Sequence, residues 1–345
     1  MDLEPPLSKQ CLSSEKDSYL VEAATVCKSD LSSVHFGTRL SDSAPFAFKT
    51  IPNKTLADRE IQTLASLSAQ PHVVHPVDSF TDPQGQSVLV LPKLASLDVN
   101  HQDLKNVAKI MRGILRGLEG IHAMGVVHLD VTPGNVMLDE HGDAVLIDFG
   151  LASKLSDGEM LPVRGTPGYL APELIAGKAH DAKVDIWSAG ILFGQMLEPH
   201  VPDCQLYSLG CKYARHDIHR SVVAHLLHFK QIRDSLGGFY PDIVYQAVDL
   251  LLCMLVEDPA DRIACTAALN HPFLKAVESE FAGTELTAMQ QRALTFSYYH
   301  AKSDMSEEDD DGYYSCSPCS FPVPSDHYAY PTLYEEDDYL SVPYH

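Results

Sequence analysis

Long apolar runs, an excess of basic residues and a secretion signal are all lacking in this chain of 345 residues. No run of 18 apolar residues occurs, and the opening M-D-L-E-P-P has neither the basic nor the apolar region of a signal peptide. We therefore expect a soluble intracellular protein, in the cytoplasm or the nucleus, without a transmembrane segment. The formal net charge of −22 argues against a face that binds nucleic acid, and it leaves no polybasic patch for anionic membranes.

The cysteines and histidines do not form a recognisable metal-binding pattern. The eight cysteines are scattered except for Cys316 and Cys319, a single C-x-x-C in a polar tail. The seventeen histidines show no H-E-x-x-H. A lone C-x-x-C without a second pair is weak evidence for zinc, so we expect free thiols in a reducing compartment.

Hydrophobic residues make up 45% of the chain, which is enough for a packed core, and no internal repeat is visible. Residues 1–18 are polar and aperiodic, which predicts a flexible leader. From residue 19 to 94 short β-type runs dominate, and one helical segment at 56–67 interrupts them. This pattern predicts a small, mostly antiparallel sheet with one helix; its strands are expected at 19–21, 33–36, 46–49 and 87–91.

After residue 94 the pattern becomes helical, so the fold class is expected to be α+β. An amphipathic stripe covers 104–124, and further helices are predicted at 182–197, 218–235, 242–256 and 264–277. Residues 279–302 are expected to form a helical extension. Residues 303–345 hold eleven acidic residues and seven tyrosines, which predicts a disordered acidic tail that could dock a partner.

The stretch from His128 to Gly150 carries the most chemical information. Asp130 is followed by Asn135 five residues later and by Asp148 thirteen residues after that. Two apolar runs, 136–138 and 144–147, flank the turn-forming residues 139–143, which predicts a β-hairpin. Its ends present a carboxylate that can orient a hydroxyl and hard oxygen ligands for Mg²⁺. Phosphoryl transfer needs both.

This order and spacing resemble the catalytic and metal-binding loops of the eukaryotic protein kinases. The resemblance implies a two-lobed kinase fold over residues 19–278, with a small lobe at 19–94, a large lobe at 95–278, and ATP between them. Asp130 would accept the proton of the substrate hydroxyl, and Asn135 and Asp148 would ligate Mg²⁺. The segment G-T-P-G-Y-L-A-P-E at 165–173 resembles serine/threonine kinases, with Thr166 beside the catalytic aspartate.

The small lobe contains the matching phosphate clamp. Ala47-Phe48-Lys49 resembles the A-x-K strand of the family, whose lysine holds the α- and β-phosphates, and Val34 lies where the family places the valine over adenine. Glu60 is the favoured partner of Lys49, and Asp58 is a weaker competitor. The gap of eleven residues between Lys49 and Glu60 predicts a brief helix or a tight linker.

The nucleotide-binding elements are less regular. Residues 90–94 fit the hinge that meets the adenine edge, with Leu91 guarding the back of the pocket and Lys93 among the binding residues. The three glycine positions of the phosphate loop fall on Cys27, Ser29 and Ser32. Because glycine lets backbone N–H groups approach phosphates closely, its absence predicts a looser cover in which Cys27 and Ser29 meet the nucleotide.

Two residues of the catalytic loop depart from the family pattern. Leu129 replaces an arginine that would pair with a phosphorylated activation segment, so activity is predicted not to depend on that phosphorylation. Thr132 replaces a lysine and is similar to the loops of conserved herpesvirus kinases, which suggests a viral origin. The resemblance also implies three scaffold residues, an ion pair between Glu173 and Arg262 and an aspartate, Asp185, that hydrogen-bonds the catalytic-loop backbone.

We therefore predict a serine/threonine protein kinase that acts on protein substrates with ATP and Mg²⁺. One alternative is a pseudokinase scaffold, which the missing glycines and Thr132 favour. Retention of Lys49, Asp130, Asn135 and Asp148 disfavours it. A small-molecule phosphotransferase shares the H-x-D-x-x-x-x-N loop, but segment 165–173 is typical of a platform for protein substrates.

Overall fold

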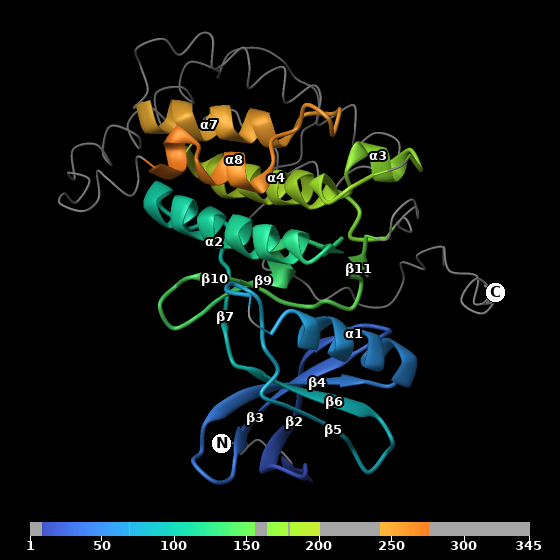
Figure 1. The fold of residues 1–345 in the computed structure, drawn as a ribbon. Coiled ribbons are helices and arrows are strands. Elements are labelled where there is room, and N and C mark those ends of the chain that lie inside the picture. The colour runs from blue at the N-terminus through green and yellow to red at the C-terminus, as the bar shows by residue number, and fades with distance from the viewer. Residues whose placement is uncertain (1–8, 69, 156–163, 179, 201–241, 276–345) are drawn as a thin grey trace, which may run out of the picture. The chain divides into compact units, whose positions relative to one another are not determined.

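A computed structural model describes residues 9–68, 70–155, 164–178, 180–200 and 242–275 (Figure 1). The helix predicted at 218–235, the extension at 279–302, the acidic tail at 303–345 and the pair Cys316 and Cys319 lie outside the described residues. In the part that is described, no helix combines the length and hydropathy needed to cross a bilayer.

The small lobe is built on a six-stranded antiparallel sheet in the order β1-β2-β3-β4-β6-β5. The expected strands at 19–21, 33–36, 46–49 and 87–91 are confirmed within β2, β3, β4 and β6. Two edge strands, β1 and β5, were not predicted. The bounds are β1 Lys9–Ser13, β2 Ser18–Lys28, β3 Ser33–Arg39, β4 Pro45–Ile51, β5 Asp78–Thr81 and β6 Ser87–Pro92.

The prediction of a flexible leader over residues 1–18 is wrong from Lys9 onward, because Lys9–Ser13 form strand β1. Lys9 to Ser13 pair with Glu22 to Ser18 of β2, and Leu12 is buried in the small-lobe core. The strand is polar because it forms the edge of the sheet, where alternate side chains face water. Backbone hydrogen bonds to β2 and the one buried apolar side chain, Leu12, hold the strand in place, so it needs no alternating apolar pattern.

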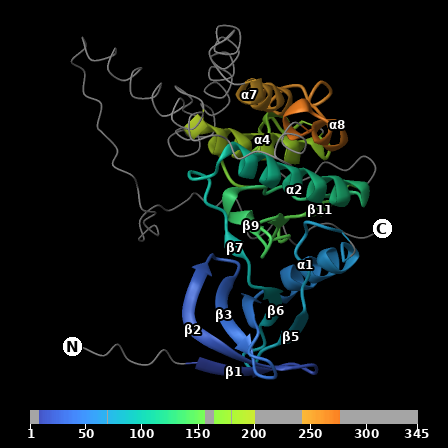
Figure 2. The same ribbon diagram turned by 90° about the vertical axis from the view of Figure 1, so that its left-hand side faces the viewer.

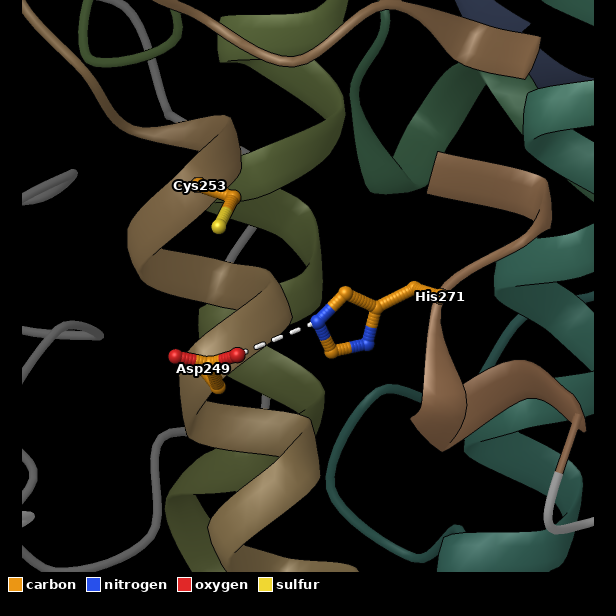
Figure 3. A group of neighbouring side chains, drawn as sticks. All are labelled: Asp249, Cys253 and His271. Carbon is orange, nitrogen blue, oxygen red and sulfur yellow. Dashed lines mark hydrogen bonds and ion pairs between the residues drawn. The ribbon is translucent and has the colours of Figure 1, made fainter. Parts of the chain in front are cut away.

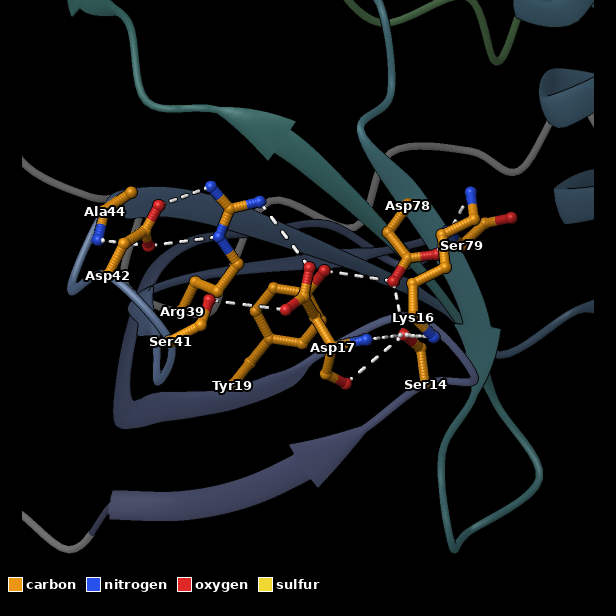
Figure 4. A network of polar contacts seen from close by, with 10 residues as sticks. All are labelled: Ser14, Lys16, Asp17, Tyr19, Arg39, Ser41, Asp42, Ala44, Asp78 and Ser79. Atoms are coloured by element: carbon orange, nitrogen blue, oxygen red, sulfur yellow. Dashed lines mark hydrogen bonds and ion pairs between the residues drawn. The ribbon is translucent and has the colours of Figure 1, made fainter.

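A polar network ties the turn after β1 to β5 (Figure 4). The Tyr19 hydroxyl donates to Asp78 Oδ2 at 3.0 Å, the Ser14 hydroxyl donates to the same oxygen, and the Ser79 N–H donates to Oδ1 at 2.9 Å. Asp78 is only 6% exposed, so these donors compensate its lost hydration. Burial and this hydrogen bond raise the pKa of Tyr19 to about 12.

This network predicts an alkaline stability change. A raised pKa in the folded state means that Tyr19 stabilises the fold fully below pH 10, and that this contribution is lost as the pH rises toward 12. Tyr19→Phe should lower the free energy of unfolding by about 1–2 kcal/mol at pH 7. Urea titrations at pH 7 to 12 should show that the free energy of unfolding falls more steeply with pH for the wild type than for Tyr19→Phe. Parallel pH dependences of the two proteins would contradict the raised pKa of Tyr19.

The register of the sheet gathers the predicted nucleotide-binding side chains on one face. Val34 lies opposite Lys49, and Ala47 lies opposite both Phe36 and Leu91. Because cross-strand partners and every second residue share a face, these five side chains share the face opposite to the small-lobe core. That core contains Leu12, Tyr19, Val21, Phe46, Phe48, Val88 and Val90.

Helix α1 (Lys54–Ser66) follows β4 after two residues, Pro52 and Asn53, which is the tight linker that the short gap to Glu60 predicted. The Asn53 side chain accepts the N–H of Leu56 at 3.2 Å and caps the helix. Because the helix begins at this cap, Glu60 lies in its second turn, where its side chain is buried and faces the sheet.

The large lobe packs α2 against α4, α8 and the β9–β10 hairpin, as two views show (Figures 1 and 2). Helices near 104–124, 182–197 and 242–256 and the hairpin are confirmed. The elements are α2 Leu104–Ala123, α3 Pro172–Ile175, α4 Lys183–Leu197, α7 Asp242–Met254, α8 Cys265–Leu269, η1 Pro133–Asn135, η2 Glu198–His200, β7 Ala95–Ser96, β8 Val126–Val127, β9 Val136–Leu138, β10 Ala144–Leu146 and β11 Ser153–Lys154.

The single helix predicted over 264–277 is wrong in its continuity: α8 ends at Leu269, and the chain is helical again over 272–275. The Asn270 N–H donates to Ala267 and the His271 N–H donates to Ala268, which closes the last turn. Pro272 cannot donate the backbone hydrogen bond that continuing α8 would require, but it suits the first position of the helical turn at 272–275.

Candidate active site

Lys49 is held by two carboxylates from different parts of the chain. Its Nζ lies 2.8 Å from Glu60 Oε1, 2.9 Å from Glu60 Oε2 and 2.8 Å from Asp148 Oδ1. Lys49 is 6% exposed and Glu60 is 3% exposed, whereas the competing Asp58 is exposed on α1. Strand β4, helix α1 and the segment after β10 therefore meet at one ammonium group.

The charges of this cluster reinforce one another. Burial alone lowers the pKa of Lys49, but the charges of Glu60 and Asp148 outweigh burial and hold that pKa above its usual value. Burial alone raises the pKa of Asp148, but the charge and hydrogen bond of Lys49, with the Gly150 N–H, bring it below its usual value. Lys49 and Asp148 therefore both stay charged through the neutral pH range.

Asp148 is presented by a strained turn. It has a φ of 58°, in the left-handed region, and its Oδ1 accepts the N–H of Gly150 at 3.2 Å. Phe149 is buried and meets the edge of the His128 ring, with 4.7 Å between the ring centroids. The His128 Nε2–H donates to the Ile147 carbonyl at 3.0 Å, so the catalytic loop, residues 128–135, and the turn at 148–150 are fixed together.

Asp185 holds the start of the catalytic loop, which confirms its predicted scaffold role. Its two oxygens accept the backbone N–H groups of His128 and Leu129, each at 2.8 Å, and Oδ2 also accepts from His122 Nε2 at 2.8 Å. Leu129 has a φ of 67°, a conformation that is costly for a branched side chain. The buried carboxylate of Asp185 stabilises that conformation and so aims the next residue, Asp130.

Both oxygens of Asp130 are engaged. Oδ2 accepts from Asn135 Nδ2 at 2.7 Å, and Oδ1 accepts the Thr166 N–H at 2.9 Å and the Thr166 hydroxyl at 2.6 Å. The predicted position of Thr166 is thus confirmed. Gly165, with a φ of 120°, permits this contact because a Cβ there would lie 2.3 Å from the Leu129 carbonyl oxygen.

The expected metal ligands lie together at the open end of the hairpin, where the Ile147 N–H donates to the Asn135 carbonyl at 3.0 Å. The Asn135 amide nitrogen is occupied by Asp130, so the amide oxygen is the atom that remains for a cation. Asp148 uses Oδ1 for Lys49, and its side chain is 43% exposed. Two oxygen donors, one of them charged, fit Mg²⁺.

The residues predicted to meet the nucleotide, Val34, Ala47 and Leu91, lie on one face of the small-lobe sheet. Lys93, after β6, places its Nζ 4.2 Å from the centroid of the Phe36 ring, a cation–π contact. Phe36 was not among the predicted site residues. Alternation from Val34 along the same strand is the signal that identifies it.

The predicted phosphate loop, residues 27–32, contains the end of β2 and a turn that the Ser29 side chain stabilises. The Ser29 hydroxyl oxygen accepts the N–H groups of Leu31 at 3.3 Å and Ser32 at 3.1 Å, and the Ser29 N–H donates to the Ser32 carbonyl at 2.9 Å. Cys27 is exposed at the end of β2. Amides that a glycine loop would direct at phosphates are therefore bound to Ser29.

Releasing these amides should strengthen ATP binding. Ser29→Gly removes the hydroxyl and restores glycine's freedom, so KM for ATP is expected to fall about three- to tenfold with kcat little changed. Ser29→Ala removes the hydroxyl alone and should give a smaller decrease. Steady-state kinetics with varied ATP tests both, and an unchanged KM in both variants would contradict this account of the turn.

A second ion pair supports the segment that ends in Glu173. Arg262 Nη1 lies 2.6 Å from Glu173 Oε1, and Nη2 lies 2.9 Å from Oε2, which confirms the predicted ion pair and shows that it is bidentate. Arg262 also donates to the carbonyls of Val256, Lys183 and Glu257, and its side chain is 0% exposed. Every donor direction of this buried guanidinium is thus used structurally.

Asp249, Cys253 and His271 form another cluster, between α7 and the end of α8 (Figure 3). Their ligand atoms lie within 4.8 Å of one another, as a metal would require. However, His271 Nδ1 accepts the Phe273 N–H at 3.3 Å, so the proton lies on Nε2, which donates to Asp249 Oδ2 at 3.2 Å. Because Nε2 would be the metal ligand, this cluster is better explained as a structural hydrogen bond.

Comparison with known proteins agrees with this geometry. The model of the protein kinase domain matches residues 25–274. The chain belongs to the protein kinase family. The kinase is 30% identical over 251 residues to the mitogen-activated protein kinases HOG1 of Alternaria brassicicola and hog-1 of Neurospora crassa; the match covers 67% of the kinase and 69% of each relative.

A solved structure also resembles the kinase. A chain of the CAK complex from Chaetomium thermophilum, solved with ATP-gamma-S bound, has a TM-score of 0.60 and 20% sequence identity. The match covers 74% of the kinase and 91% of that chain, and it supports the fold alone. It confirms the predicted α+β kinase fold. The domain match and the relatives confirm the predicted family, and the kinase is a serine/threonine protein kinase.

Proposed function

We propose that the kinase transfers the γ-phosphate of Mg·ATP to serine and threonine hydroxyls of protein substrates. The assembled clamp carries this proposal, because Lys49 Nζ lies 2.8 Å from carboxylate oxygens of both Glu60 and Asp148. Such a clamp brings the phosphate-binding lysine beside a metal-binding carboxylate, as phosphoryl transfer requires.

Each residue has a role that its contacts support. Lys49, oriented by Glu60, holds the phosphates, and Asn135 and Asp148 hold Mg²⁺ through oxygen atoms. Asp130, oriented by Asn135, accepts the proton of the attacking hydroxyl; in the structure it already accepts one hydroxyl, that of Thr166, at 2.6 Å. Bound Mg·ATP supplies the phosphoryl group, and positioning and charge neutralisation by these residues supply most of the rate.

The alternative is a pseudokinase scaffold. The serine-bound phosphate loop supports it, because the amides of Leu31 and Ser32 are directed at Ser29. The complete set of Lys49, Asp130, Asn135 and Asp148, with each side chain in a charged or hydrogen-bonded contact, favours catalysis. We therefore favour an active enzyme whose phosphate loop contacts the nucleotide weakly.

Three further features of the kinase are proposed with its function. Leu129 is buried and cannot pair with a phosphate, so activity does not depend on phosphorylation of the activation segment. Among the described residues, Cys11, Cys27, Cys253 and Cys265 form no disulfide, which suits a reducing cytoplasm or nucleus. Its substrates are proteins, with no nucleic acid or membrane partner. The viral origin suggested by Thr132 stays a prediction.

Radiolabelled ATP with Mg²⁺ and casein tests the proposal. Incorporated label should appear as phosphoserine and phosphothreonine after acid hydrolysis, and phosphatase treatment of the kinase beforehand should leave the rate unchanged. Absence of label above a no-enzyme control would favour the scaffold. A predominance of phosphotyrosine would overturn the assignment of Thr166 as a mark of serine/threonine specificity.

A further inference from the structure

Three side chains of the large lobe form a chain of hydrogen bonds behind the catalytic loop. Cys265 Sγ lies 3.7 Å from His122 Nδ1, and His122 Nε2 lies 2.8 Å from Asp185 Oδ2. Cys265 is the first residue of α8, His122 lies in the last turn of α2, and Asp185 lies in the first turn of α4. Cys265 is 7% exposed and Asp185 is 0% exposed, so bulk water has little access to either end of this chain.

The chemistry of the three groups limits the direction of each hydrogen bond. A carboxylate can only accept, so the proton between His122 and Asp185 lies on Nε2 of the ring. Burial and the negative charges of Asp185 and Glu119 raise the pKa of the Cys265 thiol, so the sulfur keeps its proton at neutral pH. The thiol thus has a proton to donate to Nδ1. In that arrangement His122 is a neutral ring whose two nitrogens are both used.

The same order of groups occurs in enzymes that use a cysteine nucleophile, in which a third residue orients the histidine base. That chemistry needs a thiol of lowered pKa that a substrate can reach. The pKa of Cys265 is raised instead, and its side chain is buried. The Asp185 carboxylate is also occupied by backbone groups of the catalytic loop. The three groups therefore suit a positioning role and not a second active site.

Asp185 connects this chain of hydrogen bonds to the catalytic loop. Its Oδ2, which accepts from His122, also accepts the His128 N–H at 2.8 Å. Its Oδ1 accepts the Leu129 N–H at 2.8 Å. One oxygen therefore receives a proton from α2 and another from the loop. A rotation of the carboxylate away from His122 would move the acceptors of both loop amides.

The loop is sensitive to such a movement because Leu129 is strained. Its φ of 67° lies in the left-handed region, which a branched side chain adopts only where neighbouring contacts impose it. Relaxation at Leu129 would rotate the next residue, Asp130, whose two oxygens are aligned by Thr166 and Asn135. A weaker hold by Asp185 should therefore slow the chemical step.

We propose that Cys265 is a positioning residue of the catalytic loop. Its thiol holds His122 in the tautomer that donates to Asp185, and Asp185 in turn holds the backbone that presents Asp130. The hydrogen-bond geometry carries this inference, and only its effect on the rate rests on the proposed kinase activity. The role needs a proton donor at position 265 and no reactive thiol, so serine should replace the cysteine in part.

The tautomer of His122 can be measured without catalysis by ¹⁵N NMR of the full chain labelled at histidine, with the spectrum of His122→Gln as the assignment. At pH 7 the wild type should show a protonated Nε2 and an unprotonated, hydrogen-bonded Nδ1. Cys265→Ala should shift the Nδ1 resonance, because the ring loses its donor, and Cys265→Ser should shift it less. A wild-type ring protonated on both nitrogens, or an Nδ1 resonance that Cys265→Ala leaves unchanged, would overturn the proposal.

Steady-state kinetics give the second measurement. Cys265→Ala should lower kcat about three- to tenfold and leave KM for ATP within about twofold, as the loss of one hydrogen bond expressed in the rate. Cys265→Ser should recover part of kcat, and it carries both measurements if Cys265→Ala does not fold. The matched control Thr266→Ala removes the hydroxyl that donates to Glu119 at 2.7 Å, a second contact between α8 and α2, and should leave kcat within about twofold.

A double variant tests whether the thiol acts through the ring. In the His122→Gln background, Cys265→Ala should lower kcat no further, because its target is gone. Additive losses, or equal losses for Cys265→Ala and Thr266→Ala, would overturn the proposal. Absence of phosphorylation by every protein, with the Nδ1 shift in Cys265→Ala as described, would refute the kinase activity and not the arrangement of the three side chains.

Discussion

Lys49→Met should lower kcat/KM for phosphorylation by about 10²–10³-fold, the cost of removing one charge-stabilising group from a catalytic centre. The variant keeps much of the apolar stem of Lys49 but removes the cation that lies 2.8 Å from both Glu60 and Asp148. The Glu60 and Asp148 carboxylates then lie close together without a positive charge between them. Their repulsion should displace Asp148 from the position in which it holds Mg²⁺.

Two companion variants separate the clamp from a general charge effect. Lys54→Met removes a lysine from the exposed start of α1 and should leave the rate within about twofold. Glu60→Gln keeps a hydrogen-bond acceptor for Lys49 but removes the charge, so an intermediate loss is expected. Steady-state rates with saturating protein substrate measure all three. A Lys49→Met enzyme as fast as Lys54→Met would rule out the clamp.

Arg262→Ala should lower the free energy of unfolding by about 3–5 kcal/mol, because it leaves Glu173 buried without its counter-ion. Glu173 is 4% exposed, and Arg262 supplies both hydrogen bonds to its carboxylate. Three backbone carbonyls, those of Val256, Lys183 and Glu257, lose a donor as well. Urea unfolding followed by tryptophan fluorescence suits this test, because the single tryptophan, Trp187, lies beside Arg262.

Arg39→Ala is the matched control for this prediction. Arg39 also forms a bidentate pair, with Asp42 at 2.6 and 3.0 Å, but the two side chains are 27% and 48% exposed. A surface pair of this kind contributes at most about 1 kcal/mol. Similar decreases in the free energy of unfolding for Arg39→Ala and Arg262→Ala would mean that burial does not determine how much the Glu173–Arg262 pair stabilises the fold.

The chemistry of the site could be predicted from the sequence because most of it is local. Asp130, Asn135 and Asp148 lie within nineteen residues on one hairpin, so their relative positions follow from strand geometry. Lys49 and Val34 could be placed because Ala47-Phe48-Lys49 resembles the A-x-K strand of the family and Val34 has the family's spacing from it. The partner of Lys49 lies on a different element, so local pattern did not decide between Glu60 and Asp58. The family resemblance was needed to favour Glu60.

The errors fall where tertiary contacts override local pattern. Strand β1 is polar and aperiodic, and its position depends on pairing with β2 and on the distant Asp78. The prediction of one continuous helix over 264–277 did not include the break before Pro272.

The most direct test of the account compares wild-type kinase with Asp130→Asn in transfer of radiolabelled phosphate from Mg·ATP to casein. The substitution preserves the shape of the side chain and an oxygen that can accept from Thr166, so the fold and nucleotide binding should persist. It removes the base, and labelling should fall by about 10²–10⁴-fold. Equal labelling by the two proteins would contradict the claim that Asp130 and its surroundings form a catalytic centre.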